Sequence, residues 1–363
     1  MIALKVVIFF SILILFHELG HFIAAKIMKV RVESFALGMG PKLLRFKGRE
    51  TEYLICALPI GGYVKLSGET DEDKIEGKPW EFLSQPVGKR FWVIVMGPIM
   101  NFFLAFLIFS MMFFSLGSFS MTAEIGNVLD NFPAKESGIL AGDKIVSIDD
   151  KTINNWQEVP NAIQSAKGES LKIIVERNKK LVTFSVKPKG KEIKDLLGKT
   201  SSMKIIGIEP KKIKLNFISS FIIGFQKTVI LTVVTYKGLF LMLIGKISPN
   251  NIMGPAGIVA ITGESAKQGL FAVFNLLGIL SVNLAVVNLL PFPVLDGGHI
   301  LFLGIEKIRR KRLNKKSQEV ITAVGITLLV LLLVFATYND FSRLGFWEKC
   351  SSFFNKIFKL SQK

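Results

Sequence analysis

The sequence predicts an α-helical polytopic membrane protein with four transmembrane helices, a small membrane-associated β-hairpin region and one inserted α+β domain. The chain of 363 residues is 50% hydrophobic, with a mean hydropathy of +0.45, which is too apolar for an ordinary soluble protein. Apolar runs of membrane-spanning length flank a middle section that is too charged to lie in lipid. A membrane protein with an extramembrane domain accounts for both properties.

The formal net charge of +18 raises the question of a nucleic-acid partner. The basic residues are scattered through loops beside apolar runs, not interleaved with aromatic residues on one soluble face, so we predict no nucleic acid. Membrane lipid with anionic headgroups, and the tendency of basic loops to remain in the cytosol, explain the charge. Only Cys56 and Cys350 are present, far apart, and both are predicted to be free thiols.

The N-terminal membrane half, residues 1–117, contains two predicted spans. Residues 4–25 are long enough to cross the hydrocarbon layer at about 1.5 Å per residue, and the basic residues that follow predict a cytosolic exit. A secretory signal is the alternative, but no small-x-small cleavage site follows the apolar core. Residues 91–116 form the second span, where Pro98 and Asn101 predict either packing against another helix or the site, or a structural kink.

Residues 30–90, between these spans, are predicted to be a cytosolic or re-entrant β region. Residues 51–58 and 63–66 have the composition of short strands around a Pro-Ile-Gly-Gly turn at 59–62. The edge of a small sheet beside an active site can bind an extended peptide as an added strand. A plain cytosolic connector is the alternative.

Residues 118–210 change in character to short β-rich runs, turns and many charges. The stretch 132–150, with the pair Gly142-Asp143, resembles the signature of bacterial PDZ domains, in which a short helix leads through Gly-Asp into a strand. Residues 171–177 and 181–186 alternate as a β-hairpin should. Because only one Gly-Asp signature of this kind occurs, the sequence predicts one PDZ-like α+β domain.

The chain after this insert is predicted to return to the membrane in stages. Residues 211–268 are expected to form interfacial amphipathic helices and a loop, because polar residues interrupt their apolar runs. An extra crossing there would also put the insert and the later basic loop on sides that disagree with the charge bias. The C-terminal membrane half, 269–338, holds a third span at about 271–308, broken near 288–298, and a fourth at about 319–338. Residues 339–363 are predicted to be an amphipathic tail on the outer membrane surface.

The predicted chemistry begins with His17 and His21 in the first span. Residues four apart on a helix share a face, so these two imidazoles can bind one metal ion, and Glu18 is close enough to accept a proton from a water molecule. This pattern is typical of zinc hydrolases. A chance match is the plain alternative, but the chain has only three histidines, and ionisable groups at membrane depth are costly unless they serve a function.

A catalytic zinc ion usually takes three protein ligands, so one more is needed. Asp296 follows a stretch in which Pro291 and Pro293 must break the helix, and broken helices in membranes mark sites. We predict Asp296, rather than His299, as the third ligand of one Zn²⁺ ion, because attraction to the cation offsets the cost of burying a carboxylate. The alternatives are helix capping by Asp296 and an interfacial position for His299.

Four spans, the His-Glu-x-x-His helix, the insert between the second and third spans, and the motif Asn-x-x-Pro-x-Pro-x-Leu-Asp-Gly-Gly resemble the site-2 protease family of intramembrane zinc metalloproteases, and within it the regulator-of-sigma-E type of bacteria. The resemblance covers nearly the whole chain. It implies one zinc ion held by His17, His21 and Asp296, with Glu18 as the general base. The residues predicted to bind substrate are Asn288, Pro291, Pro293, Gly61, Gly62 and Tyr63. Asn101 and His299 are expected to support the site.

The resemblance also implies a function. The expected substrates are single-pass membrane proteins of the anti-sigma-factor type, already trimmed by a site-1 protease, and remnant signal peptides, with the PDZ-like domain as a size filter. The expected location is the bacterial cytoplasmic (inner) membrane, with the active site toward the cytosol and the PDZ-like domain outside, in the periplasm. A membrane metal transporter or sensor is the alternative, and Glu18 discriminates because a transport site needs no free base. A peptide-binding scaffold would leave the intramembrane charges unexplained.

Overall fold

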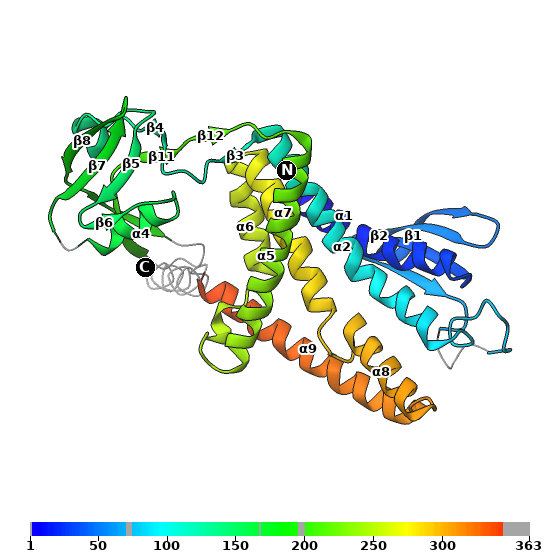
Figure 1. Ribbon diagram of the computed structural model, residues 1–363. Helices are drawn as coiled ribbons and strands as arrows, with labels where there is room; N and C mark the ends of the chain where they lie inside the picture. The colour runs from blue at the N-terminus through cyan, green and yellow to red at the C-terminus, as the bar shows by residue number, and fades with distance from the viewer. Residues whose placement is uncertain (1, 70–74, 167, 195–199, 344–363) are drawn as a thin grey trace, which may run out of the picture. The chain divides into compact units, whose positions relative to one another are not determined.

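The computed structural model describes residues 2–69, 75–166, 168–194 and 200–343. The chain divides into two compact units, residues 1–112 with 221–363, and residues 113–220. Within the described residues, five helices are long and apolar enough to cross a membrane, one more than the sequence predicts (Figure 1). They are α1 (Ile2–Ile27), α2 (Val87–Leu116), α5 (Phe217–Leu243), α7 (Leu270–Asn288) and α9 (Lys315–Arg343). Cys56 is a buried free thiol, as predicted, whereas Cys350 and the predicted tail beyond residue 343 lie outside the described residues.

Helix α5 accounts for the difference between five candidate spans and four predicted ones. The sequence predicts interfacial helices here because polar residues interrupt the apolar runs, yet one of them, Lys227, has a partner on another helix of the unit. Lys227 Nζ donates a hydrogen bond to Asn275 Oδ1 at 2.7 Å. The Thr235 hydroxyl donates to Asn283 Oδ1 at 2.8 Å. Lys227 and Thr235 therefore face α7, and the segment forms one continuous helix.

Helices α5 and α7 run in the same direction, because the contact at Lys227 and the contact at Thr235 are equally spaced on both helices. Helix α6 (Pro255–Gln268) follows α5 in the chain and leads back to the start of α7 (Figure 1). It has 14 residues and is therefore about 21 Å long. Helix α7 thus starts at the level at which α5 starts. A crossing by α5 would not change the side on which α7 ends, so the predicted conflict with the charge bias does not arise.

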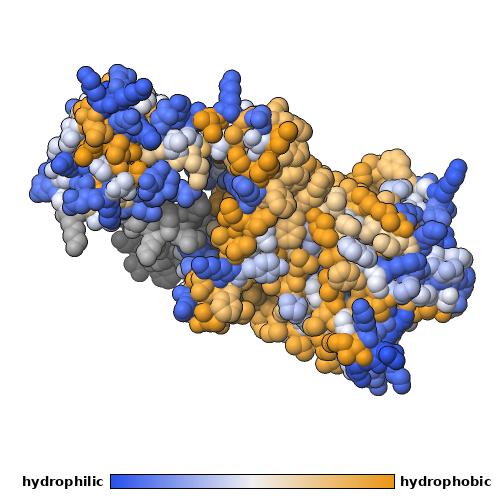
Figure 2. Space-filling model, viewed as in Figure 1, coloured by the Kyte–Doolittle hydropathy of each residue, from blue (hydrophilic) through white to orange (hydrophobic). Residues whose placement is uncertain are grey.

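Two small apolar clusters join the elements of the membrane unit in the part that the structure describes. One joins α1, α2 and α7 through Leu13, Leu104, Leu276 and Leu277. The other joins the end of α1 to the β region and α2 through Ala24, Ala25, Val30, Val32, Leu66, Phe82 and Val93. Helices α1 and α2 approach closely because Gly20 has no side chain: a Cβ atom there would lie 2.7 Å from the carbonyl carbon of Met96. Figure 2 shows apolar side chains over the outer surface of these helices.

The β region is larger than predicted. A strand that the sequence analysis missed, β1 (Val32–Lys47), pairs with β2 (Glu52–Leu66), and Ser34 has partners in both halves of β2. The predicted turn at 59–62 is a bend within this one strand, where Gly61 has a φ of +96° that favours glycine. Because the two halves of β2 flank residues 34–37 of β1, segment 62–66 is an edge of the sheet.

Glu81 organises the connection between β2 and α2. Its carboxylate accepts hydrogen bonds from the backbone N–H groups of Glu76, Gly77 and Lys78 and from the Ser84 hydroxyl, at 3.0 to 3.1 Å. Burial acts to raise the pKa of Glu81, but these donated hydrogen bonds outweigh it and lower the pKa. Residues 76–84 of this connection are therefore held together around one ionised carboxylate.

The second unit, residues 113–220, is an α+β unit around one apolar core. Its largest sheet has four antiparallel strands in the order β6-β5-β7-β8, and the β7–β8 pairing confirms the predicted hairpin. The strands of this sheet are β5 (Lys144–Ile148), β6 (Lys151–Thr152), β7 (Leu171–Arg177) and β8 (Lys180–Val186). Three further pairs are formed by β3 (Ser118–Phe119) with β12 (Lys212–Ile213), β4 (Ile125–Val128) with β11 (Ile208–Pro210), and β9 (Lys189–Lys194) with β10 (Thr200–Ile205). The helices are α3 (Pro133–Glu136) and α4 (Glu158–Ser165).

The Gly-Asp pair of this unit has a structural role. Gly142 has a φ of +93°, which a side chain would strain, and Asp143 is 1% exposed. The Asp143 carboxylate accepts hydrogen bonds from the Leu140 N–H at 2.9 Å and from Nε and Nη2 of Arg177, both at 2.7 Å. These side-chain hydrogen bonds raise the pKa of Arg177. Asp143 thereby ties the turn before β5 to the end of β7.

Candidate metal centre

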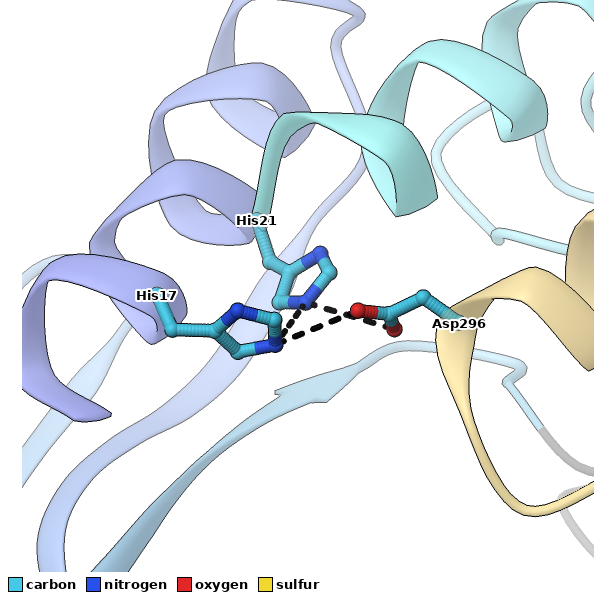
Figure 3. A group of neighbouring side chains, drawn as sticks. All are labelled: His17, His21 and Asp296. Carbon is cyan, nitrogen blue, oxygen red and sulfur yellow. Dashed lines mark hydrogen bonds and ion pairs between the residues drawn. The ribbon is translucent and has the colours of Figure 1, made fainter. Parts of the chain in front are cut away.

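Three side chains from two helices converge in the membrane unit (Figure 3). His17 and His21 lie one turn apart on α1, and their Nε2 atoms are 3.2 Å from each other. Asp296, the first residue of α8 (Asp296–Arg309), has Oδ2 at 3.2 Å from His17 Nε2 and Oδ1 at 3.6 Å from His21 Nε2. The structure thus brings together the three residues that the sequence predicts as ligands.

The donor atoms of these residues lie close enough for one metal ion. A tetrahedral zinc ion with ligand bonds of about 2.0–2.1 Å holds its ligand atoms about 3.3 Å apart. His17 Nε2 lies 3.2 Å from both His21 Nε2 and Asp296 Oδ2, and one ligand atom from each of the three residues lies within 4.8 Å of the others. Asp296 Oδ2 is buried and accepts no hydrogen bond from any described residue, although His17 Nε2 faces it. A buried carboxylate oxygen in this state is costly unless a cation compensates it. His17, His21 and Asp296 could therefore hold a metal ion.

The imidazoles of His17 and His21 pack against helix α2. His21 Nδ1 donates a hydrogen bond to the Val93 carbonyl at 2.9 Å, which leaves the lone pair of this ring on Nε2. Asn101, whose amide Nδ2 lies 3.2 Å from His17 Nδ1, confirms the expected packing of the second span against the site. Between them, a Cβ atom on Gly97 would lie 2.5 Å from His21 Cε1 and 2.9 Å from His17 Cε1. Only glycine leaves room for both rings at this position.

The break between α7 and α8 brings Asp296 to the site. Helix α7 ends at Asn288 and α8 begins at Asp296, which confirms the predicted interruption near 288–298. The loop folds back against the first turn of α8: a Cβ atom on Gly297 would lie 2.5 Å from the carbonyl carbon of Leu289, and one on Gly298 would lie 2.7 Å from that of Phe292. The two glycines thus permit this fold. Asp296 lies in the first turn of α8, and its carboxylate faces the imidazoles.

Glu18 lies on the open side of the three donors. With His21 and Asp296 it lines a cavity of about 870 Å³, and Tyr63 and Val64 of the β2 edge line the same cavity. The neighbouring Gly62 is so close that a Cβ atom there would lie 3.2 Å from Glu18 Cγ. The cavity therefore places a carboxylate, the candidate metal centre and a strand edge together.

The other residues predicted to bind substrate or support the site are spread around it. The Asn288 amide Nδ2 is 3.4 Å from His17 Nε2, and His299 lines the cavity with its ring 6.3 Å from that of Phe302. Pro291 is exposed, and Pro293 packs against Gly325 of α9. Gly61 packs against the Met39 side chain rather than against the three donors.

Sequence reasoning missed a charged cluster that lines the cavity. Arg90 of α2, 3% exposed, donates from Nη1 to Glu306 Oε2 at 3.0 Å and from Nη2 to Oε1 at 2.5 Å. Arg312 Nε lies 3.6 Å from the same carboxylate. Gly97 and the Val93 carbonyl were also missed. Of these two, only Gly97 could have been found from the sequence, because it lies one helical turn before Asn101 in the predicted span.

These features are those of a metallohydrolase whose site lies among membrane-spanning helices. The model of peptidase family M50 matches residues 5–332. The chain is 37% identical to a Clostridium acetobutylicum protein assigned as a zinc metalloprotease, over 91% of this chain and 94% of that one. It is 32% identical to a Campylobacter jejuni protein assigned likewise, over 94% and 93%. It is 29% identical to the regulator of sigma-W protease RasP of Bacillus subtilis, over 93% and 97%.

The chain belongs to peptidase family M50, the site-2 protease family. It is a multi-pass membrane zinc metalloprotease similar to RasP.

Proposed function

We propose that this protease hydrolyses peptide bonds within transmembrane segments of single-pass membrane proteins that a site-1 protease has already trimmed, such as anti-sigma factors, and of remnant signal peptides. The observation that carries the proposal is the placement of Glu18, two of the three donors and the β2 edge around one cavity, with the third donor, His17, beside the other two. A metal transporter would need the donors, but neither a free carboxylate beside them nor a strand edge.

In this proposal His17, His21 and Asp296 hold one zinc ion, and Glu18 is the catalytic base. Zinc, when bound, acidifies water and polarises the peptide carbonyl. The Glu18 carboxylate accepts the proton of the attacking water and then delivers it to the leaving amine. We assign to Asn288, whose Nδ2 lies 3.4 Å from His17 Nε2, a hydrogen bond donated to the substrate carbonyl. Burial in the membrane unit limits competing water and strengthens each of these interactions.

The substrate must lose its helical structure before it is cut, because the hydrogen bonds of a helix shield its peptide bonds. An extended segment laid along residues 62–66 of β2 would exchange those hydrogen bonds for strand pairing. Tyr63 and Val64 line the cavity, so a peptide paired there would pass beside Glu18. Gly62 leaves room for that carboxylate. This arrangement favours Gly62 and Tyr63 as substrate-binding residues.

The proposed location is the bacterial inner membrane, with the metal centre toward the cytosol. Basic residues follow α1 and also fill the α8–α9 turn, where Figure 2 shows hydrophilic side chains. The second unit, residues 113–220, is then a PDZ-like domain in the periplasm, where it would exclude proteins with large outer domains. Deleting residues 118–210 should therefore deregulate cleavage without abolishing it.

The decisive experiment compares wild-type protein with Glu18→Gln in cleavage of a model transmembrane substrate by purified protein in liposomes. The variant should keep its zinc and lose proteolysis, because the metal ligands are intact and the base is gone. Full proteolysis by Glu18→Gln would refute the mechanism. Zinc flux through wild-type liposomes without cleavage would favour a transporter. Membrane peptides that accumulate in cells carrying Glu18→Gln would identify the natural substrates.

A further inference from the structure

The second nitrogen of the His17 imidazole decides whether the first can bind a metal ion. In a neutral imidazole one nitrogen carries the proton and the other the lone pair. His17 Nε2 faces Asp296 and His21, so a ligand role requires the lone pair on Nε2 and the proton on Nδ1. The group that lies against Nδ1 must then accept a hydrogen bond.

Asn101 lies at that nitrogen. Its side chain is fully buried, its Nδ2 is 3.2 Å from His17 Nδ1, and its Oδ1 accepts no hydrogen bond from any residue that the structure describes. The two ends of a carboxamide have nearly the same shape, so their hydrogen-bond partners decide the orientation. A half-turn rotation about χ2 of Asn101 exchanges the positions of Oδ1 and Nδ2. The orphaned oxygen then gains a donor, and the Nδ1–H gains an acceptor.

The other imidazole already has this arrangement. His21 Nδ1 donates to the Val93 carbonyl, so its Nε2 is free for a metal ion. Val93, Gly97 and Asn101 are spaced by four residues and share one face of α2. This face thus supplies an acceptor for each ring, with the space at Gly97 between them.

Asn288 is the competing partner of His17, but it does not select one ring nitrogen. Its Nδ2 is 3.5 Å from Nδ1 and 3.4 Å from Nε2. Asn101 is closer, at 3.2 Å, and its backbone is held within the continuous helix α2. A fixed and buried acceptor is the kind of partner that orients metal-binding histidines.

We infer that Asn101 is a positioning residue: its side-chain oxygen accepts a hydrogen bond from His17 Nδ1–H and so holds the Nε2 lone pair toward the metal ion. This role rests on the proposed metal centre. It adds to that centre the hydrogen-bond partner of the ligand His17.

Two substitutions separate this role from simple packing. Asn101→Asp keeps an acceptor oxygen and removes the donor, whereas Asn101→Leu has neither at similar size. Ser281→Ala is the control, because it removes a hydrogen bond to the same turn of α2 without touching the side chain of Asn101. The zinc dissociation constant of each full-length protein is measured by chelator competition, and the thermal unfolding of the metal-free form is measured beside it.

We expect Asn101→Leu to weaken zinc binding by about 10- to 100-fold, the usual effect of removing the partner of a metal-binding histidine. Asn101→Asp and Ser281→Ala should bind zinc nearly as wild type does. Wild-type affinity in Asn101→Leu, or an equal loss in Asn101→Asp, would overturn the role. If Asn101→Leu does not fold, its unfolding curve will show this. The zinc affinity of Asn101→Asp then tests the role: a near wild-type affinity supports it, and a large loss overturns it. Absence of zinc binding by wild-type protein would instead refute the metal centre itself.

Nitrogen NMR of the imidazoles provides a readout independent of activity. Because the chain has only three histidines, protein labelled with ¹⁵N-histidine gives a simple spectrum, which His299→Ala and His21→Ala assign. The zinc-loaded wild-type protein should show His17 protonated at Nδ1. Protonation at Nε2 in that state would contradict the inference.

Discussion

The two sides of the metal centre are built in different ways. On the α1–α2 side, His17 and His21 come from one continuous helix, and Gly97 lets the rings lie against the next helix. On the α7–α8 side, a single ligand follows a broken segment, and Gly297 and Gly298 let a loop fold against its own helix. On the first side the spacing of two ligands follows from one helix and their space from Gly97 of the next, whereas the second side depends on how residues 289–295 fold. Damage to the first side should therefore remove the metal ion, whereas damage to the second should weaken it.

The largest effect is expected from Gly97→Ala. The added methyl group would overlap both imidazoles, so the rings must move, and misplacing reacting groups by about 1 Å costs about 100-fold in rate. Zinc content and proteolysis should fall together. Gly304→Ala on α8 is the control, since a Cβ atom there meets no described atom within 4 Å. Equal zinc content in the two variants would show that the two imidazoles pack less tightly against Gly97 than the distances indicate.

A smaller loss of metal is expected from Asp296→Asn. The amide keeps an oxygen but loses the charge that attracts the cation, so zinc should bind more weakly, while the two imidazoles retain part of the affinity. His299→Ala should leave the zinc content unchanged, because His299 is not among the three convergent donors. Metal analysis after graded dialysis measures both. Unchanged zinc content in Asp296→Asn together with a loss in His299→Ala would identify His299 as the third ligand.

The link between the two sides is tested by Arg90→Met. Arg90 joins α2 to Glu306 of α8, and removing it leaves a mostly buried carboxylate with a weaker partner in Arg312. We expect a loss of about 1–3 kcal/mol in unfolding free energy, with zinc affinity retained. Arg90→Met combined with Glu306→Gln should recover part of this loss. A double variant as unstable as the sum of the single variants would show that the pair does not couple the helices.

The smallest effect is expected at Glu81, outside both sides of the centre. Because its pKa is lowered in the folded protein, its stabilising contribution is present above the ordinary value of 4.5 and is lost as the pH falls through the lower folded value. Limited proteolysis within residues 76–84 should be slow at neutral pH and faster in acid. Glu81→Gln should be cut readily at both pH values, with zinc content unchanged. Identical proteolysis of wild type and variant at neutral pH would contradict this role.

Sequence reasoning was most successful where the structure is local. The four-residue spacing of His17 and His21 is a property of one helix, and the prolines and glycines before Asp296 mark a break wherever they occur. It failed where distant segments decide. Strand β1 has little alternation of its own and forms through pairing with β2. The polar residues of α5 indicated a membrane surface, but Lys227 is satisfied by Asn275, 48 positions away. The need for glycine at position 97 follows only from rings on another helix.

The tight packing of α2 beneath the imidazoles also fixes the direction of approach to the centre. Where Gly97 leaves no room for a methyl group, no inhibitor atom can enter either, so a compound must come from the cavity between the β2 edge and α8. A zinc-binding group alone would meet donors common to many metalloproteases. Selectivity for this enzyme would come from an extended backbone that pairs beside Tyr63, and from an anionic group that reaches toward Arg90 and Arg312.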